Sequence, residues 1–296
     1  MTRLSENTRG MLFMCASMLG FTLNDTLMKA TTQSLPLFET IFLRGLGATL
    51  GLVVIAMLTP RVSTLRLSGP DRRIVLWRTA GDVVSTALFL VALMHMPLAN
   101  LSAIMQALPL AVTLAAAVFM GDTVGWRRMS AIVVGLAGVL IIIRPGAAAF
   151  DGWSMMGLGS MLAVVLRDLA TRKLSPALPS VVPAVWGSAA VMLMGLAGAP
   201  LQGIRIPTLT EVLLTQAAAG FLIIGYLSAI KAMRVGDLSL VAPFRYTSLL
   251  WAILLGWLLF GTLPDGPTIL GAGIVVASGI YILLRQRRLS APAVRA

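Results

Sequence analysis

The sequence predicts an all-α integral membrane protein with ten transmembrane helices, arranged as two inverted five-helix repeats. Composition is the first reason: 58% of the 296 residues are hydrophobic and 11% are charged, against roughly 45–50% and about 25% in soluble domains. The second reason is a series of long apolar runs, and the third is a likeness between the two halves of the chain. A charged fraction of 11% is too small to cover the water-exposed surface of a soluble protein of this length. The composition therefore excludes a soluble enzyme, a disordered regulator and a collagen-like fibre.

Ten apolar runs are long enough to cross about 30 Å of hydrocarbon, which takes about 20 helical residues. They cover residues 10–30, 36–58, 73–95, 98–120, 126–144, 152–173, 180–199, 209–232, 238–260 and 266–285. Glycine, proline or charged residues separate them, and every connection is short. No small-x-small cleavage site follows the first run, so we expect a membrane span there and not a signal peptide. The one cysteine, Cys15, allows no intrachain disulfide.

The net charge of +12 predicts the orientation of these spans. In a soluble protein it would suggest a nucleic-acid partner, but in a membrane protein Lys and Arg gather on the cytoplasmic side. With the N-terminus inside, 16 of the 23 basic residues fall at the inner face and 3 at the outer face. We therefore expect a bacterial inner (cell) membrane protein with both termini cytoplasmic and no nucleic-acid partner.

The two halves of the chain resemble each other. Residues 92–102 align with 229–239 at an offset of 137, so that Asn100 falls opposite Asp237, and residues 120–122 align with 260–262 at an offset of 140. Earlier in each half, Asn24-Asp25 and Lys29 face Arg167-Asp168 and Arg172. Because each copy has an odd number of spans, five, the second copy enters the membrane from the opposite side and has inverted topology. We expect one membrane domain, 1–296, with repeats 10–146 and 152–288 and transport by alternating access.

The ten-span plan and several motifs are similar to the EamA type of the drug/metabolite transporter superfamily. The motifs are Asn24-Asp25-x-x-x-Lys29, Phe42-Leu43-Arg44, Met96-Pro97-Leu98-Ala99-Asn100, Ala107-Leu108-Pro109-Leu110 and Gly135-x-x-Gly138. The first motif together with Trp77-Arg78 looks most like the S-adenosylmethionine and riboflavin carriers. The resemblance implies a secondary transporter for a cofactor, vitamin or amino-acid-like metabolite. Asp122 and Thr262 stand where the family often has Glu, which leaves no acidic pair there.

Ionisable groups within spans are costly, so each one is a candidate for function. We expect Arg245-Tyr246 to bind substrate, because Pro243 just before them interrupts a helix, and opened helices often line transporter cavities. A guanidinium and a phenol suit an anionic or planar aromatic ligand. Gln106 falls opposite Pro243 in the other repeat and joins this set.

Three further groups of residues each allow two interpretations. Arg78 and Asp82 lie four residues apart on one helix. Either they neutralise each other, or Arg78 holds a substrate carboxylate or phosphate and Asp82 holds an amine or a proton. Arg44 either pairs with Glu39 or another helix, or contacts substrate. Asp25 and Lys29 form either an outer gate or an ordinary helix-end pair.

The remaining candidates are Asn24 and Trp186 for substrate binding and Asp168 for gating or coupling. Asp168 points about 100° away from its neighbour Arg167, so the two should not share a partner. We expect no cofactor and no metal, because the only histidine, His95, has no companions at ligand spacing. A lipid-modifying enzyme or a channel is the alternative function, and the sequence is compatible with a homodimer.

Overall fold

The computed structural model describes residues 6–59, 67, 69–145, 152–175, 177–235 and 238–290, except the side chains of 238–239 and 286–290. Asp237 of the predicted repeat motif and the basic residues Arg3, Arg61, Arg66 and Arg295 lie outside the described residues, as do the side chains of Arg287 and Arg288. Within the described ranges the chain is helical and contains no strand. The prediction of an all-α fold is confirmed.

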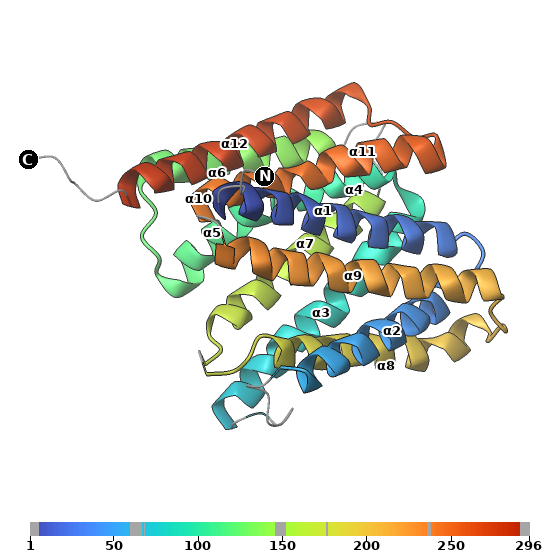
Figure 1. Cartoon of the computed structure of the whole chain (residues 1–296). Helices are drawn as coiled ribbons and strands as arrows, with labels where there is room; N and C mark the ends of the chain where they lie inside the picture. Colours follow the sequence, from blue (N-terminus) through green and yellow to red (C-terminus); the bar gives the residue numbers. More distant parts are fainter. Residues whose placement is uncertain are drawn as a thin grey trace, which may run out of the picture. The chain divides into compact units, whose positions relative to one another are not determined.

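The helices follow one another with short connections (Figure 1). They are α1 (Glu6–Thr31), α2 (Leu37–Met57), α3 (Gly69–His95), α4 (Leu98–Met105), α5 (Leu108–Met120), α6 (Trp126–Ile143), α7 (Trp153–Arg172), α8 (Val181–Gln202), α9 (Leu209–Val235), α10 (Leu238–Val241), the 3₁₀ helix η1 (Ala242–Tyr246), α11 (Thr247–Phe260) and α12 (Gly266–Ser290). Counting α4 with α5 and η1 with α11, ten described segments are long and apolar enough to cross a membrane. The prediction of ten spans is confirmed.

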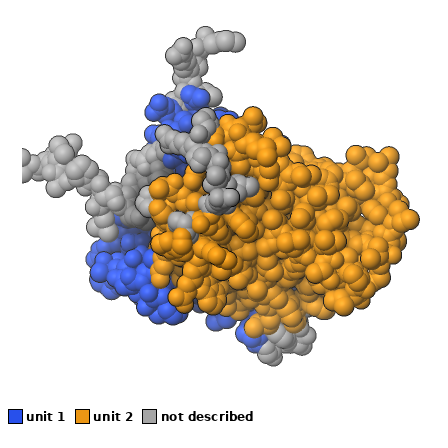
Figure 2. Space-filling model, turned by 90° about the horizontal axis from the view of Figure 1, so that it is seen from below, with its two compact units in different colours: residues 1–22, 97–151, 224–296 blue, residues 23–96, 152–223 orange. Residues whose placement is uncertain are grey.

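The chain divides into two compact units, coloured separately in Figure 2. Unit 1 contains residues 1–22, 97–151 and 224–296, and unit 2 contains residues 23–96 and 152–223. Helices α1 and α9 contribute to both units, because the division falls within each of them. Each unit therefore takes helices from both predicted repeats.

In unit 2, glycines bring α2 and α8 together, and the two helices run side by side in Figure 1. A Cβ atom on Gly45 would lie 2.8 Å from the Cα atom of Met192, and one on Gly195 would lie 2.5 Å from the backbone nitrogen of Phe42. A larger side chain at either position would force the helices apart.

In unit 1, the corresponding close contact joins α6 and α12. A Cβ atom on Gly138 would lie 2.8 Å from the carbonyl oxygen of Gly271, and one on Gly271 would lie 2.5 Å from that of Gly138. A buried apolar cluster also links α1, α9 and α10; it consists of Met14, Met18, Ala232 and Val241, with Phe13, Phe21, Phe244 and Trp251 packed against it.

Glycines end the helices α5 and α11 in the same way. Gly121 and Gly261 have φ angles of 75° and 63° and adopt the left-handed conformation, which residues with a Cβ atom rarely adopt. After five residues in each case the chain enters the next helix, at Trp126 and at Gly266.

A serine on α1 and a serine on α7 make the same kind of bond to another helix. In unit 1 the hydroxyl of Ser17 donates to the carbonyl oxygen of Gly225 on α9, at 2.7 Å. In unit 2 the hydroxyl of Ser160 donates to the carbonyl oxygen of Ser85 on α3, at 2.9 Å. Both serines are fully buried, so each bond satisfies a hydroxyl that water cannot reach.

Acidic residues near the starts of α3 and α9 hold the loops that connect other helices. Asp71 accepts a bond from the backbone N–H of Ser175, at 3.0 Å. Glu211 accepts a bond from the hydroxyl of Ser34, at 2.8 Å, and also pairs with Arg205. Both carboxylates are buried. They therefore fix these loops by charge-assisted hydrogen bonds.

Candidate functional site

The main concentration of charge within the described spans lies on α3 and α7 in unit 2. It consists of Arg78, Asp82, Arg167 and Asp168, which we call the charged cluster. Arg78 Nη1 donates to Asp82 Oδ2 at 2.7 Å, and Arg167 Nη1 lies 3.6 Å from Asp82 Oδ1. One carboxylate thus faces two guanidinium groups.

Arg167 also extends the charged cluster to its own neighbour in the sequence. Its Nε and Nη2 atoms donate to Asp168 Oδ1, at 3.0 and 2.9 Å. The two neighbours bond each other, and of the two only Arg167 pairs with Asp82, so the prediction that Arg167 and Asp168 do not share a partner is not contradicted. Arg167 joins Asp168 to Asp82.

Two glycines make room for the charged cluster. A Cβ atom on Gly81 of α3 would lie 3.0 Å from the carbonyl oxygen of Ala163 and from Arg167 Cβ, so the absence of a side chain lets α3 approach α7. A Cβ atom on Gly187 of α8 would lie 2.2 Å from Asp82 Oδ2. The Arg78–Asp82 pair therefore occupies the space that a side chain on α8 would otherwise fill.

The charged cluster has a formal net charge of zero, and its side chains remain partly accessible. The side chains of Arg78 and Asp82 are 14% and 16% exposed, and those of Arg167 and Asp168 are 32% and 33% exposed. Arg78 Nη1 also donates to the carbonyl oxygen of Pro183 on α8, at 2.7 Å. Paired charges inside a span are typical of sites that exchange partners with a ligand.

A second polar group joins the C-terminal half of α1 to α2. The amide of Asn24 donates to Asp25 Oδ1 at 2.9 Å, and Asp25 and Arg44 attract each other electrostatically. Asn24 Oδ1 and Arg44 Nε are buried and have no hydrogen-bond partner among the described residues. These atoms leave bonding capacity for a ligand close to a carboxylate and a guanidinium.

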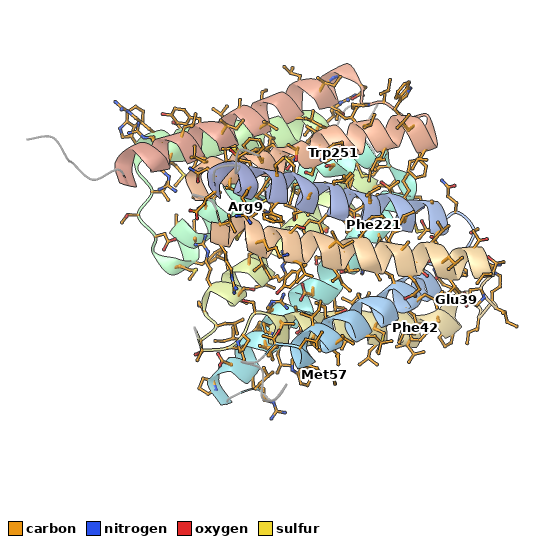
Figure 3. The ribbon with its side chains drawn as sticks, viewed as in Figure 1. Arg9, Glu39, Phe42, Met57, Phe221 and Trp251 are labelled. Carbon is orange, nitrogen blue, oxygen red and sulfur yellow. The ribbon has the colours of Figure 1, made fainter. Side chains whose placement is uncertain are left out.

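Glu39 is not the partner of Arg44. Its Oε1 atom accepts a bond from the backbone N–H of Arg205, at 2.6 Å, and Figure 3 shows Glu39 toward one end of α2 with Met57 at the other. Arg44 lies more than one helical turn farther along. The Glu39 alternative for Arg44 is therefore wrong, and Asp25 on α1 is the acidic group that interacts with it.

Lys29 binds at the end of α3, and Trp186 precedes Gly187 on α8. The ammonium group of Lys29 is buried and donates to the carbonyl oxygens of Leu93 and Met96 at the end of α3, the latter at 2.9 Å. Trp186 on α8 is 46% exposed. Lys29 thus satisfies the carbonyl groups at the end of a helix, which is a structural contact.

In unit 1, the predicted interruption of the ninth span is present. The chain forms the 3₁₀ helix η1 around Pro243. A second interruption, which we did not predict, separates α4 from α5 at Gln106. The cause is Pro109, which has no N–H to donate to the carbonyl oxygen of Met105. The Gln106 side chain crosses to the other interruption, where it donates to the Tyr246 carbonyl oxygen at 3.2 Å.

Arg245 and Tyr246 face different surroundings. Tyr246 is buried, and its hydroxyl lies directly against Gly279 of α12, where a Cβ atom would overlap it. Arg245 keeps accessible surface and has no ion pair with any described residue. Arg245 thus keeps accessible surface, whereas the Tyr246 hydroxyl is buried and has no hydrogen-bond partner among the described residues.

Sequence reasoning undervalued Arg167 and missed Gly187. Arg167 counts among the ionisable groups within spans from the sequence alone, and the predicted repeat aligns Arg167-Asp168 with Asn24-Asp25. This alignment could have added Arg167 to the substrate-binding candidates. Gly187 gave no signal, because only the structure places it against Asp82.

Comparison with known proteins gives consistent matches. The model of the EamA-like transporter family matches residues 8–144. The chain is 30% identical to a riboflavin transporter of Vibrio cholerae, over 68% of this chain and 67% of that protein. It is 24% identical to an S-adenosylmethionine uptake transporter of Rickettsia bellii, over 65% of this chain and 66% of that protein.

Other matches extend over nearly the whole chain. The pseudopaline exporter CntI of Pseudomonas aeruginosa PAO1 is 25% identical, over 92% of this chain and 95% of that protein. A solved structure, described only as the crystal structure of a protein, has a TM-score of 0.64 and 20% identity, covering 96% of this chain and 100% of that one. The latter likeness concerns the fold alone.

Proposed function

The chain belongs to the EamA-like transporter family and is a multi-pass membrane protein that transports a small organic metabolite, and we propose that its substrate carries a zwitterionic amino-acid group. The observation that carries this proposal is the arrangement of Asp82 between the guanidinium groups of Arg78 and Arg167. S-adenosylmethionine, which carries such a group, is the first substrate to test. Riboflavin is the second, because it is the named cargo of another relative.

The charged cluster can accept a zwitterion by exchanging partners. A substrate carboxylate would bond Arg167, whose contact with Asp82 is loose at 3.6 Å, through the two parallel bonds that guanidinium and carboxylate groups favour. The substrate ammonium group would then bond Asp82 or Asp168. Because the ammonium and carboxylate groups are exchanged together, the amino-acid group itself adds no net charge to the span.

We assign supporting roles to the other predicted residues. Arg245, which has no ion pair with any described residue, and the Asn24–Arg44 group extend the set that contacts substrate. Gln106 and Trp186 are weaker members of it. Asp25 and Asp168 are the acids available for coupling or gating, whereas Lys29 stabilises the end of α3. Tyr246 packs against α12, and its buried hydroxyl, which has no hydrogen-bond partner among the described residues, keeps it in the substrate set as a weaker member.

Transport proceeds by alternating access of two inverted repeats, 10–146 and 152–288. Paired bonds at matching positions support this. Ser17 and Ser160 are related by the offset that aligns Asn24 with Arg167. Asp71 and Glu211 occupy the third position of helices that are both 27 residues long. Each pair joins helices or loops drawn from opposite copies, as a two-fold relation between the copies requires.

The distribution of basic residues supports a bacterial inner-membrane location with both termini in the cytoplasm. The bilayer and the metabolite are the partners in this proposal, nucleic acid is not one, and a homodimer is compatible with it. The direction of transport follows from the substrate gradient and any coupled ion.

The test is uptake by proteoliposomes that contain the purified protein. Labelled S-adenosylmethionine, riboflavin and a neutral amino acid are offered with and without an imposed proton gradient, and preloaded vesicles measure efflux. We expect S-adenosylmethionine to move well above empty vesicles and Arg167→Gln to reduce its uptake with little effect on insertion. Transport of riboflavin alone, insensitive to Arg167→Gln, would overturn the zwitterion assignment.

A further inference from the structure

A groove in unit 1 lies between the start of α6 and the last turns of α12. Its volume is about 440 Å³, and Trp126, Arg127, Val134 and Tyr281 are among the residues that line it. This volume is within the roughly 300–1,000 Å³ of small-molecule sites. None of these residues belongs to the charged cluster or to the interruptions of the fourth and ninth spans.

The groove exists because α6 and α12 are in tight contact farther along. Gly138 and Gly271 touch backbone to backbone, which brings the helix axes close together at that point. Toward Trp126, small residues line the space between the helices, notably Ala131 and Ala277. The helices therefore leave a furrow that runs about 10 Å along α6 from Arg127 to Val134.

One end of the groove attracts anions. Arg127 is exposed, its guanidinium lies 5.2 Å from the Trp126 ring, and it has no ion pair with any residue that the structure describes. Gly125 at the N-cap of α6 supplies no side-chain bond to the first amides of the helix, so their partial positive charge remains available. Tyr281, 44% exposed, brings a hydroxyl from α12.

The other end is apolar and faces outward. Val134 is 54% exposed and belongs to a predicted membrane span. The groove thus combines a basic and aromatic end, at the point where the span begins, with an apolar end deeper in the span. Tryptophan, tyrosine and arginine are the residues that favour the headgroup level of a bilayer.

We propose that this groove binds an anionic phospholipid, with its phosphate at Arg127 and Tyr281 and part of an acyl chain along Ala131, Val134 and Ala277. The match of charge selects this occupant, since the cationic end lies at headgroup level and the furrow behind it is hydrocarbon-lined. Basic pockets between transmembrane helices bind anionic headgroups in this way. A second copy of the chain would bring a second Arg127 into the same region, and like charges would oppose it.

Native mass spectrometry of the detergent-purified protein tests the proposal. Dioleoylphosphatidylglycerol and dioleoylphosphatidylcholine are added at equal concentrations. We expect the wild type to retain the anionic lipid about fivefold better, the factor expected for one basic residue near an anionic surface. Arg127→Gln should remove the preference. Arg72→Gln, which changes another exposed arginine, on α3, should preserve it.

A second variant tests the shape of the groove separately from the charge of Arg127. Val134→Trp fills the apolar end without altering Arg127, and it should lower retention of both lipids while the protein stays monodisperse. Equal retention of the two lipids by the wild type, or a preference that survives Arg127→Gln, would overturn the proposal. So would a shift from dimer to monomer on Val134→Trp, which would identify a second copy as the occupant. No transport is measured, so the outcome is independent of the proposed substrate.

Discussion

In unit 2, α3 and α7 meet through the charged cluster, whereas in unit 1 α6 and α12 meet through the glycine pair Gly138 and Gly271. Both arrangements bring helices close together within membrane spans. The ion pairs that the structure describes inside the spans all lie in unit 2. In unit 1, the described pair Arg144–Asp265 lies just outside them.

The contrast separates structural packing from function. Glycine contacts let helices approach without placing any charge in hydrocarbon, so unit 1 shows that close packing here needs no ions. The charged cluster is therefore not required merely to hold helices together. Because its charges carry a cost that the glycine pair avoids, the substrate exchange that we propose gives the reason for keeping them.

The largest effect is expected from Asp82→Asn. Removing this carboxylate leaves Arg78 and Arg167 facing each other without their shared partner. Breaking a fully buried pair costs about 3–5 kcal/mol, and partial exposure should reduce this to about 2 kcal/mol. We expect S-adenosylmethionine uptake to fall by at least about tenfold and the unfolding temperature in detergent to drop.

Asp265→Asn is the control for this variant, since it also removes one carboxylate from an arginine pair but does so outside the spans. It should transport at the wild-type rate. Equal losses in the two variants would mean that the charged cluster has no special part in transport.

Gly187→Ala tests the charged cluster without removing a charge. The new methyl group would lie 2.2 Å from Asp82 Oδ2 and must displace the Arg78–Asp82 pair. Overpacking of this kind costs about 1–3 kcal/mol, so we expect uptake to fall about fivefold. Gly220→Ala, on α9 with no atom within 4 Å of the new methyl group, should leave uptake unchanged. Wild-type uptake by Gly187→Ala would contradict the exchange of partners at Asp82.

The sequence predicted the features that depend on composition and local spacing. Ten spans follow from apolar runs, the Arg78–Asp82 pair follows from helical spacing, and the 3₁₀ segment at η1 follows from Pro243. Each of these depends on residues within one stretch of chain. Hydrophobic length, the i, i+4 rule and proline chemistry are enough to predict them.

The features that the sequence did not predict depend on contacts between distant segments. Arg167 reaches Asp82 from another helix, and Gly187 makes room for that carboxylate from a third. Tyr246 was expected beside Arg245, yet its hydroxyl packs against Gly279. Neighbours in a 3₁₀ helix point about 120° apart, so adjacency in the sequence did not imply a shared surface.

A smaller effect, limited to stability, is expected from Gly138→Ala in unit 1. The methyl group would lie 2.8 Å from the Gly271 carbonyl oxygen, and backbone atoms cannot move aside as a flexible side chain can. We expect a loss of about 1 kcal/mol, at the low end for overpacking, seen as a lower unfolding temperature with an unchanged KM for transport. Gly273→Ala, on the partner helix α12 with no atom within 4 Å of the new methyl group, is the control. A raised KM for Gly138→Ala would weaken the distinction between the two units.

The smallest effect is expected from the pair outside the spans. The bond from Arg144 is the first reason that the pKa of Asp265 lies at about 2 instead of 3.8. Because the folded pKa is below the unfolded one, the pair stabilises the folded chain fully above about pH 4, and this stabilisation is lost as the pH falls toward 2. The Asp265 side chain is 51% exposed, so the contribution stays below about 1 kcal/mol. Unfolding temperatures of the wild type and Arg144→Gln should therefore converge as the pH is lowered through this range, while uptake at neutral pH stays equal. A difference that persists at the lowest pH would assign the stability of this region to packing of the Arg144 side chain and not to its charge.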